Sequence, residues 1–292
     1  MNNKLFIIVI VGVVTLFGAL VLFSDNESTP ASDTQPQLRL SDIHGLEVAI
    51  DDPDKLYLPN HQGLYFQEAD GVLQKAGSIS DDLMSFAVSP TEPDVFYASG
   101  HPKTGGNFGL IKTTDGGDTW TNISDGLDGP VDFHTMAIDN VNEQLIYGYY
   151  RGALQRSSDG GLSWEYVENA PEQIIQLSAG QNEARLYAAT VSGLQVSENA
   201  GDSWDALATI NETVAAVEVN AENGQMFAYG VNRGLLVSDN KGETWVEVDL
   251  DSVDDQVLYI TSSRNNPKQV YLVTRSLEIY KSTDGGETWS LR

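Results

Sequence analysis

All five tryptophans of this chain lie at the end of one short motif that recurs at nearly constant intervals. Trp120, Trp164, Trp204, Trp245 and Trp289 are separated by 44, 40, 41 and 44 residues. The five copies read KTTDGGDTW (112–120), RSSDGGLSW (156–164), VSENAGDSW (196–204), VSDNKGETW (237–245) and KSTDGGETW (281–289). A period of about 42 residues is typical of propellers and other repeat arrays. The interval therefore predicts one repetitive domain.

Each repeat holds short apolar runs that are separated by polar turns. The first runs are GLEVAI (45–50), SFAVS (85–89), TMAID (135–139), IQLSA (175–179), AAVEV (215–219) and YITSS (259–263). Two more runs precede each tryptophan motif, and the residues after the tryptophan supply a fourth. The first repeat has only a degenerate motif at 67–74. We therefore expect an all-β fold: a six-bladed β-propeller of four-stranded antiparallel blades over residues 41–292.

The tryptophan motif itself has the composition of a tight hairpin turn. Its Ser or Thr and its Asp can bond the backbone of the turn, and its glycines permit positive φ. The tryptophan can pack beneath the hairpin. We expect the motif to join the third and fourth strands at the rim and to be structural.

These motifs resemble the Asp-box, or BNR, repeat of sialidases, sortilin-type receptors and photosystem assembly propellers. The resemblance covers residues 42–292 and implies the propeller fold. It implies no single activity, because the same repeat occurs on proteins with unrelated functions.

The N-terminal segment differs sharply from the repeats. Residues 5–23 are an uncharged run of 19 residues, long enough to span a bilayer, and Lys4 is the one base before it. We expect residues 1–23 to be a single-pass anchor in the cell membrane, residues 24–40 a flexible linker, and the propeller to lie outside the cytoplasm. The alternative is a cleaved signal peptide and a secreted propeller.

The charge balance and the lack of cysteine exclude several classes of function. The chain has 42 acidic and 16 basic residues, with a net charge of −26. Such a field repels nucleic acid, so we expect no DNA or RNA partner. No cysteine is present, and any metal site must therefore use His, Met or oxygen ligands.

The four histidines all lie in the first three repeats, at related positions. His44 and His134 each lie two residues before the centre of a first strand, and Met84 has the same place in the second repeat. His61 and His101 each lie four residues after a second-strand tyrosine. In a propeller blade, both positions open near the axis at the same end of the ring. We therefore expect these five side chains to face a common space.

Four imidazoles and one thioether predict a metal site. Imidazole is the most frequent protein metal ligand near neutral pH, and a thioether is a soft ligand. The set points first to copper and second to zinc. One alternative is a polar pocket for another small ligand. The other is that the histidines only form hydrogen bonds with the backbone. Asp42 and Asp132, each two residues before a histidine, could orient the imidazoles.

Two further features bear on the same end of the ring. The segments DIHGLEV, NHQGLY, ASGHP and DFHTMAI resemble a group of bacterial exported Asp-box proteins that are often labelled glycosyl hydrolases. The resemblance implies that all four histidines belong to a shared pattern. The second repeat also carries a glycine-rich insertion, HPKTGGNFG (101–109), which could fold over a pocket.

An enzyme is the main alternative to a metal-binding module. Arg151 and Arg275 share the position of His61 and His101 in their repeats, and Arg233 lies two residues further on. With Tyr150, these arginines could form an anion clamp of the sialidase type. The arginine-containing motif that sialidases carry near the N-terminus is missing. We expect a copper-binding module first, a sialidase-like or other glycoside hydrolase second, and a scaffold for a protein partner third.

Overall fold

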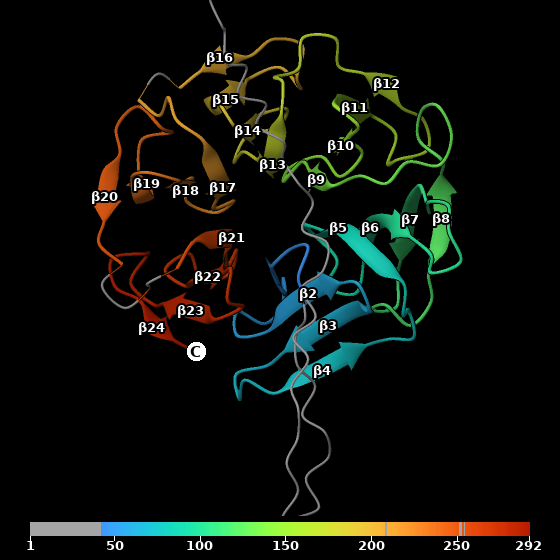
Figure 1. Cartoon of the computed structure of the whole chain (residues 1–292), viewed down its shortest axis with the longest axis horizontal. Coiled ribbons are helices and arrows are strands. Elements are labelled where there is room, and N and C mark those ends of the chain that lie inside the picture. The colour runs from blue at the N-terminus through green and yellow to red at the C-terminus, as the bar shows by residue number, and fades with distance from the viewer. Residues whose placement is uncertain (1–41, 208, 251–252, 254) are drawn as a thin grey trace, which may run out of the picture. The chain divides into compact units, whose positions relative to one another are not determined.

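The computed structural model describes residues 42–292 apart from 208, 251–252 and 254. Within these residues the chain forms six four-stranded sheets, and the strands of each sheet lie in chain order. Every pairing is antiparallel, as between β2 (Leu56–Asn60) and β3 (Gly63–Gln67). The sheets are arranged as blades in a ring (Figure 1). The predicted six-bladed all-β propeller is therefore confirmed.

The first three blades hold the strands that position the candidate site. Blade 1 adds β1 (Glu47–Val48) and β4 (Leu73–Ala76) to β2 and β3. Blade 2 consists of β5 (Asp82–Val88), β6 (Phe96–His101), β7 (Leu110–Thr113) and β8 (Thr121–Ser124). Blade 3 consists of β9 (Thr135–Ile138), β10 (Ile146–Tyr150), β11 (Ala153–Ser157) and β12 (Glu165–Tyr166).

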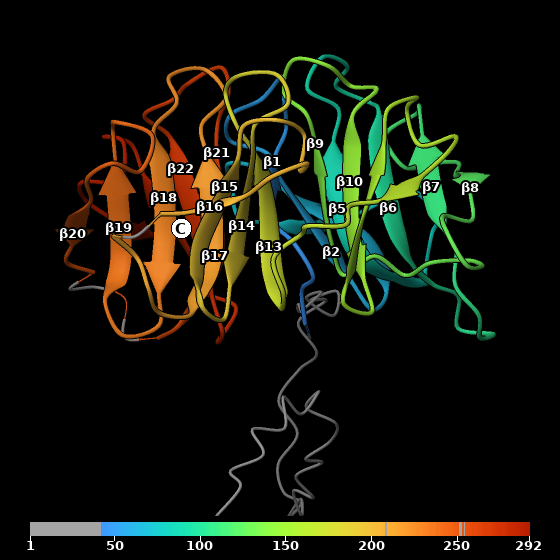
Figure 2. The same ribbon diagram turned by 90° about the horizontal axis from the view of Figure 1, so that it is seen from above.

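The remaining blades complete the ring. Blade 4 consists of β13 (Ile174–Ala179), β14 (Leu186–Thr190), β15 (Gly193–Ser197) and β16 (Asp205–Ala206). Blade 5 consists of β17 (Val214–Val219), β18 (Met226–Gly230), β19 (Gly234–Ser238) and β20 (Val246–Val248). Blade 6 consists of β21 (Val257–Ser262), β22 (Val270–Thr274), β23 (Ile279–Ser282) and β24 (Ser290–Leu291). The first strand of each blade is innermost and the fourth is at the rim, and the inner strands run along the axis (Figures 1 and 2).

The apolar core lies between neighbouring blades. At the contact of blades 1 and 2, the rings of Tyr57, Phe86 and Phe96 pack together, with Tyr57 and Phe96 centroids 4.7 Å apart. Aromatic and β-branched residues favour such half-buried sheet surfaces. Each blade thus buries its faces against the next, and this fixes the ends of the inner strands.

The tryptophan motifs form the rim turns that the sequence predicts. In the last copy, Ser282 Oγ accepts a bond from Gly286 N–H at 2.8 Å and donates to Asp284 Oδ1 at 2.7 Å. Trp289 donates to the Gly286 carbonyl at 3.1 Å, and Gly286 has a φ of 90°. These bonds satisfy the turn from within, so the motif has a structural role.

We expect Ser282→Ala to lower the free energy of unfolding by about 1–3 kcal/mol, because it leaves a buried N–H without an acceptor. Chemical denaturation of the full chain measures this change. Ser290→Ala, at an exposed position of β24, is the matched control and should change stability by less than about 0.5 kcal/mol. Equal effects of the two variants would contradict the structural role.

Blades 6 and 1 meet through side chains. Tyr271 Oη donates to the Pro53 carbonyl at 2.9 Å, and the Arg292 guanidinium donates to the Glu68 carbonyl at 2.7 Å. Lys281 pairs with Asp54 across the same joint. Within the described part of the chain, the first and last blades exchange no strand. These contacts therefore close the ring.

A cavity of about 120 Å³ lies along the inner strands of all six blades. Burial, together with the charge of the nearby Glu218, raises the pKa of Glu47 to about 8. Burial also raises the pKa of Glu218 to about 7. These two carboxyl groups therefore gain protons near neutral pH instead of adding full charge to the cavity.

The membrane anchor predicted for residues 5–23 lies outside the described residues, as does the linker 24–40. Among the residues that the structure describes, no helix is long and apolar enough to cross a bilayer.

Candidate functional site

Three blades bring histidines to one end of the ring. His44 precedes β1 and donates its backbone N–H to Pro59 in β2 at 2.9 Å, while His134 precedes β9 and donates to Tyr149 in β10 at 3.0 Å. His61 lies in the turn between β2 and β3, and His101 ends β6. The start of an inner strand and the end of the second strand are adjacent in an antiparallel blade. All four histidines therefore lie at the same end.

The carboxylate of Asp82, the first residue of β5, joins three of these histidines. His61 Nδ1 makes a short hydrogen bond to Asp82 Oδ2. His44 Nε2 lies 3.4 Å from Asp82 Oδ1, and His101 Nε2 lies 3.5 Å from Asp82 Oδ2. The side chain of Asp82 is only 9% exposed. One buried carboxylate thus organises imidazoles from two blades.

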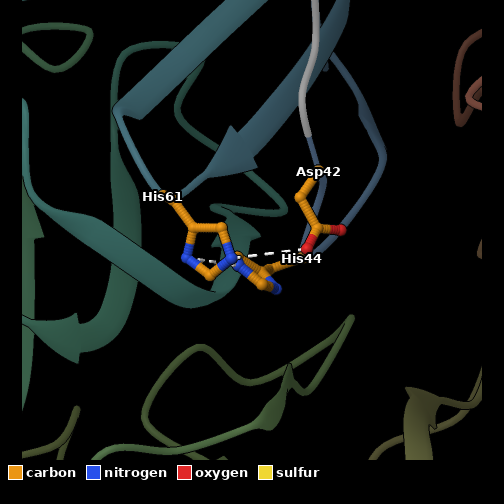
Figure 3. Close-up of side chains that lie close together, drawn as sticks. All are labelled: Asp42, His44 and His61. Atoms are coloured by element: carbon orange, nitrogen blue, oxygen red, sulfur yellow. Dashed lines mark hydrogen bonds and ion pairs between the residues drawn. The ribbon is translucent and has the colours of Figure 1, made fainter. Parts of the chain in front are cut away.

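Asp42, His44 and His61 form a compact group within the cluster (Figure 3). One donor atom from each side chain lies within 4.8 Å of the other two. His44 Nε2 is 3.3 Å from His61 Nδ1, and His61 Nε2 is 3.3 Å from Asp42 Oδ2. Asp42 and Asp82 therefore contact opposite nitrogens of the same imidazole ring.

The two close imidazoles differ in their affinity for protons. Burial lowers the pKa of His44, and the charge of His61 also lowers it, although Asp82 and Asp42 act in the opposite direction. Burial alone would lower the pKa of His61, but the hydrogen bond and charge of Asp82, together with Asp42, raise it. His44 thus favours the neutral form, and His61 is the proton carrier of the pair.

His134 forms a second pair beside this cluster. Its Nε2 lies 3.5 Å from Asp132 Oδ2, and this interaction raises the pKa of His134. The charge of Asp82 also raises the pKa of His134, and the charge of Asp132 opposes the lowering of the pKa of His44. The two buried aspartates, which lie at the ends of neighbouring blades, therefore both act to raise the pKa values of His44 and His134.

Met84 is the predicted ligand that remains apart from these contacts. It lies at a β-bulge, where the pairing of β5 with β6 shifts between Leu83 and Ser85, and it is half-buried. The contacts that join the cluster involve nitrogen and oxygen atoms. The structure therefore brings His44, His61 and His101 together, sets His134 beside them, and adds no sulfur contact.

The glycine-rich insertion of blade 2, which begins at His101, makes contacts with blades 2 and 3. Asn107 donates to the Pro130 carbonyl at 2.8 Å and to Tyr150 Oη at 3.1 Å. The backbone N–H of Lys103 donates to Asp81 at 3.0 Å. The loop is thus fixed to blades 2 and 3, and it holds Tyr150 6.3 Å from the ring of His134.

The three arginines of the expected anion clamp have separate surroundings. Arg233 Nε lies 2.8 Å from Glu247 in the outermost strand β20, so its guanidinium is directed away from the axis. The Arg151 guanidinium lies over the ring of Tyr150, 5.0 Å from its centroid. Arg275 is exposed and donates its backbone N–H to Gln256. The structure does not bring Arg233 to the common space that the clamp requires.

The sequence reasoning did not identify Asp82, the residue with the most contacts to histidine. Its signal was present as a repeated spacing: Asp precedes His by two residues at 42–44 and 132–134, and precedes Met84 in the same way at 82–84. Aligning the three repeats on this Asp, rather than on the histidines, would have placed all three carboxylates at one end of the ring.

Comparison with known proteins agrees with the repeats and the fold. The BNR/Asp-box repeat model matches residues 280–291. A xyloglucanase of Hypocrea jecorina (strain QM6a) is 24% identical over 226 residues, which cover 65% of this chain and 25% of that protein. The chain therefore spans about a quarter of this relative.

Solved structures show the same fold. The GH74 xyloglucanase of Xanthomonas campestris superposes with a TM-score of 0.60 and 18% identity, covering 85% of this chain and 45% of that one. YCF48 bound to D1 peptide gives a TM-score of 0.58 and 18% identity over 90% of this chain and 88% of that chain. The chain is thus a six-bladed β-propeller with Asp-box repeats, and it resembles glycosyl hydrolase propellers. The sequence similarity to a xyloglucanase agrees better with the glycoside hydrolase alternative than with the copper-binding module that the histidines predicted.

Proposed function

We propose that this propeller hydrolyses xyloglucan or a related polysaccharide at the end of the ring that carries Asp82 and Asp132. The observation that carries the proposal is the similarity to a xyloglucanase over 65% of the chain. The histidine-lined end carries two buried carboxylates, Asp82 of blade 2 and Asp132 next to blade 3. The arginine clamp of a sialidase is not part of this proposal.

We assign the reaction to the carboxylates of Asp82, the first residue of β5, and Asp132, which precedes β9. Glycosidases use two carboxyl groups, about 5–5.5 Å apart when they retain anomeric configuration and about 6.5–9.5 Å apart when they invert it. Asp82 and Asp132 are each 7% exposed. Among the described residues, Asp132 Oδ1 has no hydrogen-bond partner, and Asp82 Oδ1 has only the ion-pair contact with His44 Nε2 at 3.4 Å. Buried oxygens that lack a hydrogen bond are unusual unless they have a catalytic or ligand-binding role.

The direct test is the release of reducing ends from xyloglucan by the full chain. We expect hydrolysis of this polymer above the rate of a heat-denatured sample. A sialic acid substrate serves as the control and should remain intact. Lack of hydrolysis of xyloglucan and of related glucans by a folded sample would refute the proposal.

We also propose that the apolar run 5–23 anchors the propeller outside the cytoplasm. A polymer substrate of this kind does not cross a membrane, so a domain that cleaves it must be exported. The run of 19 uncharged residues behind a single lysine supports this arrangement.

A further inference from the structure

We propose that Asp42, His44 and His61 bind a divalent transition-metal ion, either copper(II) or zinc. This site goes beyond the proposed hydrolysis: its three ligands take no part in that proposal, and Asp82 is the residue that the two proposals share. They come from the segment before β1 and from the turn between β2 and β3, so blade 1 supplies all three ligands.

The spacing of the donor atoms suits one ion. The three atoms lie within 4.8 Å of one another, whereas ligands of a tetrahedral zinc ion, bound at about 2.0–2.2 Å, lie about 3.3–3.6 Å apart. Small side-chain rotations close this difference. Asp42 and His61 have the freedom to make them, because their side chains are 53% and 48% exposed.

Asp82 prepares the imidazoles for this role. It accepts a hydrogen bond at His61 Nδ1, which leaves Nε2 directed toward Asp42. A carboxylate on the far nitrogen fixes the tautomer of a metal-binding histidine and raises its basicity. Asp82 Oδ1 is buried and makes no hydrogen bond among the described residues, only the contact with His44 Nε2 at 3.4 Å, so a nearby cation would further offset its charge. Asp82 is therefore a positioning residue for the site.

The donor set selects the class of ion. Two imidazoles and one carboxylate, with water at an open position, match zinc sites and copper(II) sites. Calcium and magnesium prefer sites made of oxygen alone. Copper(I) favours soft sulfur ligands, and no sulfur takes part in the contacts of the cluster. The sequence analysis expected copper first and zinc second. The donor set excludes copper(I) and favours copper(II) and zinc equally.

Calorimetric titration of the metal-free full chain with zinc chloride or copper(II) chloride tests the site. We expect one ion per chain, and tighter binding of copper(II) than of zinc, as the Irving–Williams order requires. Asp82→Asn should weaken binding about 10–100-fold, the typical effect of losing such an outer partner. His44→Ala and Asp42→Asn remove ligands and should weaken it more. Circular dichroism confirms that each variant is folded.

His134→Ala is the matched control, because it removes an imidazole at the same end of the ring and should leave the affinity unchanged. Copper(II) bound to the wild type should show electron paramagnetic resonance couplings to two imidazole nitrogens, and His44→Ala should reduce them to one. Weak binding of several ions that no variant changes would overturn the site. Asp132→Asn separates the two proposals, since it should lower the hydrolysis rate by about 10²–10⁴-fold and retain the metal.

Discussion

Asp132→Asn is expected to lower the rate of xyloglucan hydrolysis by about 10²–10⁴-fold, the usual contribution of a general acid or base. Asparagine keeps the shape of the side chain but can neither donate a carboxyl proton nor accept one. Asp132 is buried next to His134, with the unpartnered Oδ1 described above. Initial rates of reducing-end release by the full-length variant and wild type measure the effect.

Asp118→Asn is the control for this experiment. Asp118 lies in the rim turn of blade 2 and is exposed, so the same change of charge there should leave the rate within about twofold of wild type, as surface substitutions usually are nearly neutral. Asp82→Asn should resemble Asp132→Asn if both carboxylates act in the reaction. Full activity of both buried variants would rule out this carboxylate pair.

Phe227→Ala is expected to lower the free energy of unfolding by about 3–5 kcal/mol, the range for truncating a buried phenylalanine. Phe227 in β18 is 0% exposed and packs with core residues of blades 5 and 6. Its ring also lies against the rim turn of blade 6, where a Cβ added to Gly286 would come within 2.6 Å of it. Truncation therefore leaves a cavity between two blades and removes support from a turn.

Denaturant unfolding followed by tryptophan fluorescence measures this loss. Val246→Ala, at a side chain that is 69% exposed in β20, is the control and should change stability by less than about 0.5 kcal/mol. Below its melting temperature, Phe227→Ala should retain the hydrolysis rate, because the site lies in blades 1–3. A loss of stability no larger than that of the control would contradict the packing described here.

The fold was predictable because the residues of each repeat determine its strands and turns through local interactions. The motif from Ser282 to Trp289 satisfies its turn internally, so its presence in sequence fixes a hairpin irrespective of the rest of the chain. The common end of His44 and His61 also followed from blade geometry. The contacts of individual side chains could not be predicted in this way. Arg233 pairs with Glu247, and Met84 lies at a β-bulge. Such choices depend on packing between residues that the repeat does not specify.

The way in which the ring closes has a consequence for its mechanical behaviour. Five of the six junctions between blades are crossed by the chain itself, whereas the junction of blades 6 and 1 depends on groups such as Tyr271 and Arg292 among the described residues. A load that widens the ring would therefore part this junction first and leave every sheet whole. Ile43, between Asp42 and His44, belongs to the apolar core that blade 1 shares with Tyr271 of blade 6. Such an opening would therefore also disturb the segment that carries two residues of the histidine cluster.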